Sequence, residues 1–501
     1  MISRRAALGL GALGFVAPAA VAAISASAPS PVGAQSAPAS GPLLDRPIVV
    51  KWRYEINAEY GDTPLIADGV AYGRAQGSFA FALDAETGVE LWRQSLAAGW
   101  TSAAIGDGLA LFATVPGGIV ALDATTGTQE WRFETSERIT FTPVIAQGVV
   151  YFAEQYGDLY ALDLATGAEK WRSSVTRDEW YSVQSFTLWN DTAFTITDDP
   201  QLIALDIETG KEKWSIGAEN NRFGTPVLEN GVLYFTGSDG LYALDAETGN
   251  PIWQFIGESG GFHGPVLENG VVYWSVFDGP LYALDAESGE MIWQNFAGGY
   301  GAANFGIDGT TLVYELATGG QMFPFYTVHG IDKQSGQEIW RSEEFWDVTS
   351  IALPGDGTVV VNQYHTRDNT GDRILFALDV ATAAEIWRLT TAGGFSGQTS
   401  FSNGNLYTAG RNGTTFCLGN LPSAILAADV TLRGAPSSTG IERGTAVAGD
   451  RIDTISTRNT GAGQEWIEVT IGDATGWIPL EAIDPATIPP EGEIEYVYIP
   501  D

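Results

Sequence analysis

The sequence has few of the residues on which redox, metal and nucleic-acid chemistry depend. It holds one cysteine, Cys417, and three histidines, His263, His329 and His365, in 501 residues. A single cysteine excludes an intramolecular disulfide, and the histidines share no ligand spacing, so we expect no metal site. Only 25 Lys and Arg stand against 61 Asp and Glu, which gives a net charge of -36. Such an acidic surface disfavours nucleic acid and anionic membranes as partners.

Long apolar runs are also lacking, except at the start of the chain. Residues 1–34 contain no acidic residue, and Arg4-Arg5 precede the apolar run from Leu10 to Ile24. This pattern predicts a secretory signal, and the arginine pair resembles a twin-arginine signal; an ordinary secretory signal that happens to carry two arginines is the alternative. We therefore expect an exported mature chain with no integral membrane segment. We also expect no direct lipid attachment, because no cysteine follows the signal.

One short motif is present many times. It is a strand ending in Leu-Asp or Ile-Asp, a Gly four residues after the Asp, and a Trp four residues after the Gly. The motif Trp residues, together with Trp52 near the start, are Trp52, Trp92, Trp131, Trp171, Trp214, Trp253, Trp293, Trp340 and Trp387. In the last copy Ala383 takes the place of the Gly.

Each part of the motif has a physical role. The Asp carboxylate accepts hydrogen bonds from backbone N–H groups just after it and favours a turn, and the Gly allows a positive φ. We therefore expect strain, or another turn type, at Ala383. The Trp is large enough to fill the gap between one repeat and the next, which such a small unit needs in order to bury its apolar face.

The repeat length predicts the architecture. Successive motif Trp residues stand 39 to 47 positions apart, as Trp92 to Trp131 and Trp340 to Trp387 show. Three short strands fit before each Trp strand, and four strands per period of ~40 residues are typical of a propeller blade. The Trp residues give nine outer strands. The last three-strand unit, roughly Gln398 to Leu418, has no Trp strand of its own, and we expect the strand around Trp52 to complete it and close the ring.

The repeat form Tyr-Ala-Leu-Asp-x-x-Thr-Gly-x-x-x-Trp, seen at residues 242–253, resembles the pyrroloquinoline-quinone-type (PQQ-like) β-propellers. The resemblance covers about residues 46–420. It implies an all-β, eight- or nine-bladed propeller, with eight blades as the family habit. The group holds quinoprotein dehydrogenases and non-enzymatic relatives, among them the propeller lipoprotein of the outer-membrane barrel assembly machinery. Its enzymes carry an adjacent cysteine pair, calcium ligands and often a haem motif. This chain has neither the pair nor the haem motif, so we expect no cofactor, pyrroloquinoline quinone included.

A different pattern follows the repeats. Leu432-Arg433 with Pro436, Trp466 with Val469, and Gly476-Trp477-Ile478-Pro479 resemble a bacterial SH3 domain over residues 425–484. The expected organisation is a signal at 1–34, a Ser/Ala/Pro-rich linker at 35–45, a propeller at 46–420, the SH3-like domain, and an acidic, Pro-rich tail at 485–501. We expect this tail to be mostly disordered.

Aromatic residues mark the crossings from one expected blade to the next. In a propeller these crossings gather on one face around the central channel. A ring of aromatics there suits the stacking of a flat ligand, a sugar or a peptide. Packing of each aromatic beneath its own loop is the alternative. The candidate ligand-binding residues are Trp100, Trp180, Tyr181, Phe262, His263 and Trp346; Phe345 lies in the same kind of crossing, and the crossing at Ile139–Phe141 fits the pattern least clearly.

These features predict an exported, non-catalytic binding or scaffolding protein, located in the periplasm, at the cell wall or outside the cell. The propeller would bind a protein or ligand, and the SH3-like domain would contact peptide or cell-wall material, as the resemblance implies. The alternatives are an exported quinoprotein-like enzyme that uses the propeller funnel, and a soluble envelope assembly factor.

Overall fold

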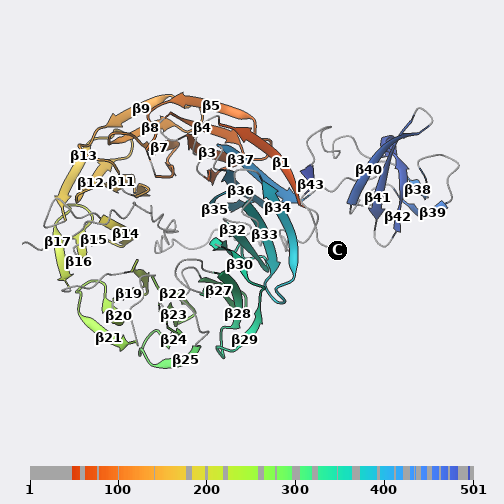
Figure 1. Cartoon of the computed structure of the whole chain (residues 1–501). Helices are drawn as coiled ribbons and strands as arrows, with labels where there is room; N and C mark the ends of the chain where they lie inside the picture. Colours follow the sequence, from red (N-terminus) through yellow and green to blue (C-terminus); the bar gives the residue numbers. More distant parts are fainter. Residues whose placement is uncertain are drawn as a thin grey trace, which may run out of the picture.

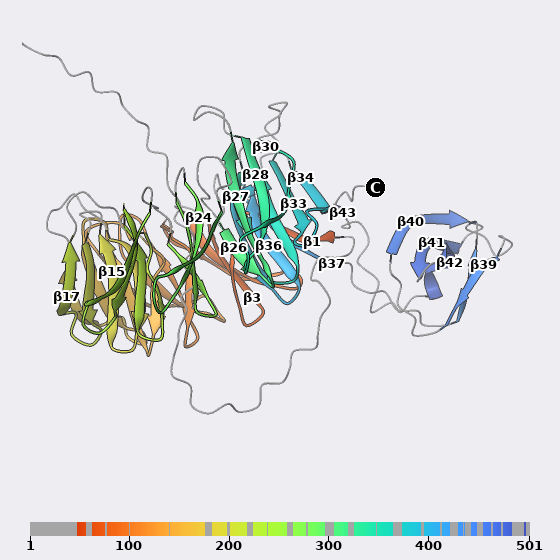
Figure 2. The same cartoon turned by 90° about the horizontal axis from the view of Figure 1, so that it is seen from below.

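Short β-strands, many of them joined by tight turns, make up most of the residues that the computed structural model describes (Figures 1 and 2). The residues that it describes are 48–56, 63–75, 78–99, 101–139, 141–175, 183–197, 201–217, 224–237, 239–257, 264–276, 279–295, 305–318, 325–346, 348–363, 373–391, 395–410, 413–420, 429–433, 435, 442–447, 454–461, 464–471, 474–482 and 495–496. Within them no helix is both long and apolar enough to cross a membrane.

Eight antiparallel sheets follow one another along the chain, each built from consecutive strands; seven have four strands and one has five. The first four are β2 (Leu65–Ala67), β3 (Val70–Ala75), β4 (Phe79–Asp84) and β5 (Glu90–Ser95); β6 (Ala104–Gly106), β7 (Leu109–Ala113), β8 (Ile119–Asp123) and β9 (Gln129–Phe133); β10 (Val144–Ala146), β11 (Val149–Ala153), β12 (Asp158–Asp163) and β13 (Glu169–Ser174); and β14 (Val183–Trp189), β15 (Thr192–Thr197), β16 (Gln201–Asp206) and β17 (Glu212–Gly217).

The next four continue in the same way. They are β18 (Val227–Glu229), β19 (Val232–Thr236), β20 (Gly240–Asp245) and β21 (Pro251–Ile256); β22 (Val266–Glu268), β23 (Val271–Ser275), β24 (Leu281–Asp285) and β25 (Met291–Asn295); β26 (Phe305–Asp308), β27 (Thr311–Thr318), β28 (Phe325–Asp332) and β29 (Glu338–Arg341), with β30 (Phe345–Trp346) also paired to β28; and β31 (Val348–Ala352), β32 (Thr358–Gln363), β33 (Arg373–Asp379) and β34 (Glu385–Thr391). The sheets lie around a ring (Figure 1), which confirms the all-β, propeller-type fold.

A ninth sheet is assembled from distant parts of the chain. Its strands β35 (Phe395–Ser402), β36 (Asn405–Gly410) and β37 (Thr414–Asn420) are joined by β1 (Ile48–Glu55), which pairs antiparallel with β37 from Ile48 opposite Asn420 to Glu55 opposite Thr414. The prediction that the strand of Trp52 completes the last unit is confirmed. A fifth strand, β43 (Glu495–Tyr496), pairs with the other edge of β1. The tail is therefore not wholly irregular, because at least these two residues lie in a sheet.

The Asp and Gly of the motif build one turn eight times. The Asp carbonyl accepts a hydrogen bond from the N–H four residues on, as between Asp84 and Gly88 at 2.8 Å. The Asp carboxylate also accepts bonds from the backbone and hydroxyl of the residue three positions on, as Thr87 shows at 2.8 and 2.7 Å. The seven motif glycines have φ between 68° and 72°. Ala383 keeps the same turn with φ 60°, so the expected strain is present and the turn type is unchanged.

Eight of the nine Trp residues pack against the turn of the following sheet; the exception is Trp387, which faces the ninth sheet. A Cβ added at Gly289, for example, would lie 2.6 Å from the ring of Trp253. The indole Nε1 then donates to the carbonyl of the residue after the next motif Asp. Eight such bonds, of 2.6–3.3 Å, start from Trp52, Trp92, Trp131, Trp171, Trp214, Trp253, Trp293 and Trp340. The Trp residues thus have the packing role between repeats that the sequence predicts.

The C-terminal part forms a separate five-stranded sheet, which lies beside the ring (Figure 1). Its strand order is β39-β38-β42-β41-β40, and a short 3-10 helix, Leu480–Ala482, follows β42. Leu432, Trp466, Val469 and Ile478 are buried in it, and Trp477 is half-buried. The strands are β38 (Val430–Arg433), β39 (Glu442–Ala446), β40 (Thr454–Gly461), β41 (Gln464–Ile471) and β42 (Ala474–Pro479).

Candidate functional site

The candidate aromatic residues at the crossings fall almost entirely outside the described residues. This holds for Trp100, Trp180, Tyr181, Phe262 and His263, while Trp346 is placed by its backbone alone, in β30. Two crossing aromatics are described in full. Phe345 is buried and lies 4.8 Å from the ring of Phe376, and Phe141 stacks on Phe186 with ring centroids 6.0 Å apart. Both serve packing, and the ligand-binding ring stays a prediction.

His329 is the one histidine among the described residues, and it is a buried structural group. Its Nδ1 lies 2.9 Å from the Glu338 carboxylate, its Nε2 lies 2.7 Å from the Thr327 hydroxyl, and its ring stacks on Tyr314. Burial lowers the pKa of His329, against the opposing effect of the Glu338 carboxylate. Within the described ranges no three His, Cys, Asp or Glu side chains gather closely enough to hold a metal ion.

Cys417 is equally enclosed. It is a fully buried residue of β37, opposite Trp52 of β1, in the apolar cluster that also contains Tyr407. Burial raises the pKa of the Cys417 thiol to about 12. The thiolate is the reactive form of cysteine, so this side chain is chemically inert at neutral pH.

The turns that lead into the outer strands carry a set of ionised carboxylates. Hydrogen bonds from the hydroxyl and the backbone N–H three residues on lower the pKa of seven turn aspartates: Asp84, Asp123, Asp163, Asp206, Asp245, Asp285 and Asp332. These bonds occupy the carboxylates in holding the turns. The set accounts for part of the strongly negative charge of the chain.

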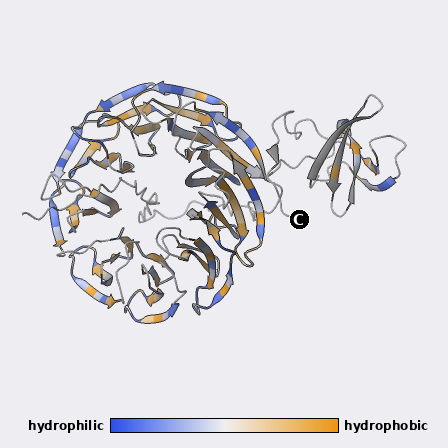
Figure 3. Ribbon diagram, viewed as in Figure 1, coloured by the Kyte–Doolittle hydropathy of each residue, from blue (hydrophilic) through white to orange (hydrophobic). Residues whose placement is uncertain are grey.

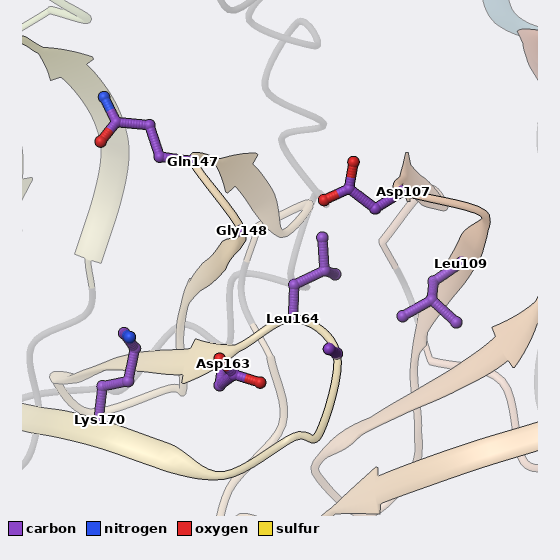
Figure 4. Close-up of a pocket in the computed structure, with 8 residues that line it drawn as sticks. Asp107, Leu109, Gln147, Gly148, Asp163, Leu164 and Lys170 are labelled. Carbon is purple, nitrogen blue, oxygen red and sulfur yellow. The ribbon is translucent and has the colours of Figure 1, made fainter.

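A pocket of about 320 Å³ lies between one of these turns and two hairpins (Figure 4). Asp107, Gln147 and Gly148 line it from the two hairpins, and Asp163 and Lys170 from the motif turn and the strand that follows it. The carboxylate of Asp163 already accepts bonds of 3.0 and 2.7 Å from Thr166. The pocket therefore offers a surface hollow rather than a set of converging reactive groups.

The outer surface of the ring differs from one side to the other. On β21, β25 and β29 it exposes five aliphatic side chains, which we call the aliphatic rim: Ile252 (47% exposed), Ile256 (59%), Met291 (49%), Ile292 (50%) and Ile339 (49%). Figure 3 shows the contrast between these strands and the largely hydrophilic β9, β13 and β17.

The contrast is also seen at the position directly before the motif Trp, apart from β5, where Leu91 is 49% exposed. Ile252, Ile292 and Ile339 each directly precede the motif Trp of their strand. At that same position β9 has Glu130, β13 has Lys170 and β17 has Lys213, all exposed. A charged side chain at the position before the motif Trp is thus compatible with the fold, so the isoleucines are not required for core packing. Composition alone did not reveal the rim; the residue before each motif Trp was the signal that could have done so.

The sequence matches the model of one known protein family. The family model described as "Outer membrane protein assembly factor BamB" matches residues 50–187, 157–294, 223–343 and 324–421, which overlap to cover the whole ring. No curated protein matches the sequence.

Solved structures similar to the chain include three of low sequence identity. BamB from Moraxella catarrhalis is 18% identical, with 74% of this chain and 99% of that chain covered and a TM-score of 0.49. Quinohemoprotein alcohol dehydrogenase ADHIIG from Pseudomonas putida HK5 is 14% identical, with 78% and 80% covered and a TM-score of 0.48. The computationally designed Ika8 protein is 12% identical, with 73% and 98% covered and a TM-score of 0.48.

Proposed function

Because the chain belongs to the family of outer membrane protein assembly factor BamB, we propose that it is an exported, non-catalytic scaffold that binds other proteins. Proteins of this kind act outside the cytoplasm, in agreement with the acid-free, arginine-containing start of the sequence. We further propose a closed ring of nine blades, one for each sheet of the ring. The C-terminal sheet would be an SH3-like barrel that contacts peptide or cell-wall material.

The aliphatic rim is the observation that carries the proposal. Five large apolar side chains, each about half exposed, follow one another on three neighbouring outer strands. Exposed apolar groups that are contiguous mark interaction surfaces, whereas isolated ones are common on any protein. Covering the exposed half of one such side chain contributes ~1 kcal/mol to binding. A partner that covers the whole rim therefore gains several kcal/mol.

The shape and charge of the rim indicate the kind of partner. Among the described strands, β21 and β25 are the last of their sheets, so their outer edges have unpaired backbone groups that another strand could use. Glu247, Glu287, Glu290 and Glu338 lie in or next to these strands. We propose an extended segment of a partner protein, with apolar side chains toward the rim and basic residues at its ends.

Site-specific photo-crosslinking tests this function. A photoreactive phenylalanine derivative at Ile292 should crosslink to protein from a cell-envelope extract, while the same derivative at Lys170, which has the same place in its own strand, should not. Ile252→Lys, Ile292→Lys and Ile339→Lys combined should abolish the crosslink from Met291 and leave the melting temperature unchanged. Equal crosslinking at positions 292 and 170 would refute the rim as the binding surface. Dye reduction that depends on added pyrroloquinoline quinone and calcium would refute the non-catalytic assignment.

A further inference from the structure

The ninth sheet contains both ends of the described chain. The chain leaves this sheet at Asn420 with the end of β37, builds the C-terminal sheet, and returns to the same sheet with β43. The register places Tyr496 opposite Val49 and Glu495 opposite Val50. β1 therefore lies between two strands that come from the C-terminal part of the chain, β37 on one edge and β43 on the other.

Among the outer strands, β1 is the one for which pairing on both edges matters most. In the eight other sheets a turn of a few residues joins the outer strand to its neighbour, so the two strands stay at a high local concentration. β1 is separated from β37 by the whole ring. Its outer edge would otherwise present unpaired N–H and C=O groups, which is the usual site for the addition of another strand.

The sequence of the tail suits this position. Around β43 the residues are Ile494, Glu495, Tyr496, Val497, Tyr498 and Ile499, a run of β-branched and aromatic residues within an otherwise Pro-rich and acidic segment. Pro489-Pro490 precede the run and Pro500 follows it, and proline commonly bounds strands. Figure 1 shows β43 between β1 and the C-terminal sheet, so the strand needs no second molecule to reach this edge.

We propose that the outer edge of β1 is a strand-binding site and that its ligand is the C-terminal segment around Glu495–Tyr496 of the same chain. The segment clamps the seam at which the ring closes. It also gives the C-terminal sheet a second connection to the ring, in addition to residues 421–429.

Disulfide trapping in the full-length chain tests the pairing. Residues directly opposite each other in an antiparallel pair have Cα atoms ~4.5–5.5 Å apart, a separation that a disulfide tolerates. Val49→Cys combined with Tyr496→Cys should form a disulfide within one molecule under mild oxidation. Val49→Cys combined with Glu495→Cys is the matched control, and should form far less because neighbouring side chains of a strand point to opposite faces. Cys417 does not compete, because it is buried.

Truncation gives an independent readout. A chain ending at Glu493 should melt a few degrees lower than the parent, and a synthetic peptide of residues 492–501 should bind it at one to one and restore the loss. The same peptide with Tyr496→Pro should not restore it, because proline lacks the backbone N–H. Disulfide-linked dimers, equal trapping in the two cysteine pairs, or a truncated chain that melts with the parent and binds no peptide would each overturn the proposal.

Discussion

The eight sheets built from consecutive strands differ from the ninth sheet in how the outer strand is held and in how the Trp of the preceding sheet is bound. In each of the eight, a turn that starts at Asp joins the two outermost strands, and it accepts a hydrogen bond from the Trp of the preceding sheet. The ninth sheet has Gly419 where the others have Asp, and its outer strand arrives from the other end of the chain. The Trp that faces it, Trp387, is fully buried, yet its Nε1 has no hydrogen-bond partner among the described residues.

The difference between these sheets shows which interactions are not required for closure of the ring. The turn and the indole hydrogen bond occur eight times but are missing at the seam, where the ring still closes. Backbone pairing occurs at all nine sheets, and the Trp is buried at seven of them and half-buried, as Trp214 and Trp253, at the other two. We infer that ring burial and strand pairing hold the propeller together, and that the hydrogen bond and turn add smaller increments.

The largest effect is expected from truncation of the Trp at the seam. Trp52 is 5% exposed, and its ring lies 6.0 Å from that of Tyr407. We expect Trp52→Ala to lower the free energy of unfolding by ~3–5 kcal/mol, as for other fully buried large side chains. Chemical denaturation measures this loss, with Leu91→Ala, an exposed residue, as the control. A Trp52→Ala protein as stable as the parent would show that the ring closes in another way.

A methyl group in a motif turn should have the next largest effect. Gly289 has φ 72°, and a Cβ there would meet the ring of Trp253 at 2.6 Å. We expect Gly289→Ala to cost ~2 kcal/mol, from the left-handed backbone and from displacement of the ring. Gly309→Ala is the matched control, because its φ is also positive but no atom lies within 4 Å of the added Cβ. Equal losses in the two variants would exclude the Trp contact as a cause.

The indole hydrogen bond can be isolated by comparing two Trp residues. Trp131 donates to the carbonyl of Leu164 at 2.8 Å, whereas Trp387 has no partner among the residues that the structure describes. We expect Trp131→Phe to destabilise the protein by ~1 kcal/mol more than Trp387→Phe, because only the first change leaves a buried carbonyl without its donor. Identical losses would mean that the bond contributes nothing measurable.

A change in the opposite direction is expected at the one motif turn without glycine. Ala383 has φ 60° and packs beside the cluster that contains Trp340. Ala383→Gly should raise the free energy of unfolding by up to ~1 kcal/mol, because relief of the strained backbone exceeds the entropy that glycine adds to the unfolded chain. Thermal denaturation measures the gain. A loss of stability would show that the Ala383 methyl group contributes more by packing than it costs in strain.

The smallest effect concerns pH. Seven turn aspartates have a pKa below the ordinary value, so near pH 3–4 the folded chain binds fewer protons than the unfolded chain. Their contribution is present above the unfolded pKa of about 4 and is lost as the pH falls through the folded pKa. Asp285→Asn should make the acid-induced loss of stability slightly less steep. An unchanged slope would mean that the turn bonds do not distinguish the ionised carboxylate from the neutral amide.

Much of this fold could be predicted from the sequence because every copy of the motif contains the residues that determine its turn and its packing. The Asp, Gly and Trp spacing predicted the turns, the strand period and the pairing of the Trp52 strand with the last unit, and the strain at Ala383 followed from its place in the motif. β43 was missed because the acidic, Pro-rich composition of the tail concealed the short β-forming run around Tyr496. The aliphatic rim was missed because apolar and charged residues both occur at the position before the motif Trp, so the repeat pattern alone does not mark that position as exposed.

Hydrogen exchange along β1 tests the account most directly. If both ends of the chain hold the seam, the backbone amides of residues 48–55 should exchange as slowly as those of residues 129–133 in β9. Removal of residues 494–501 should speed exchange in β1 and leave β9 unchanged. Fast exchange of β1 in the full-length protein, or protection that does not depend on the tail, would contradict a ring closed by pairing of β1 with both β37 and β43.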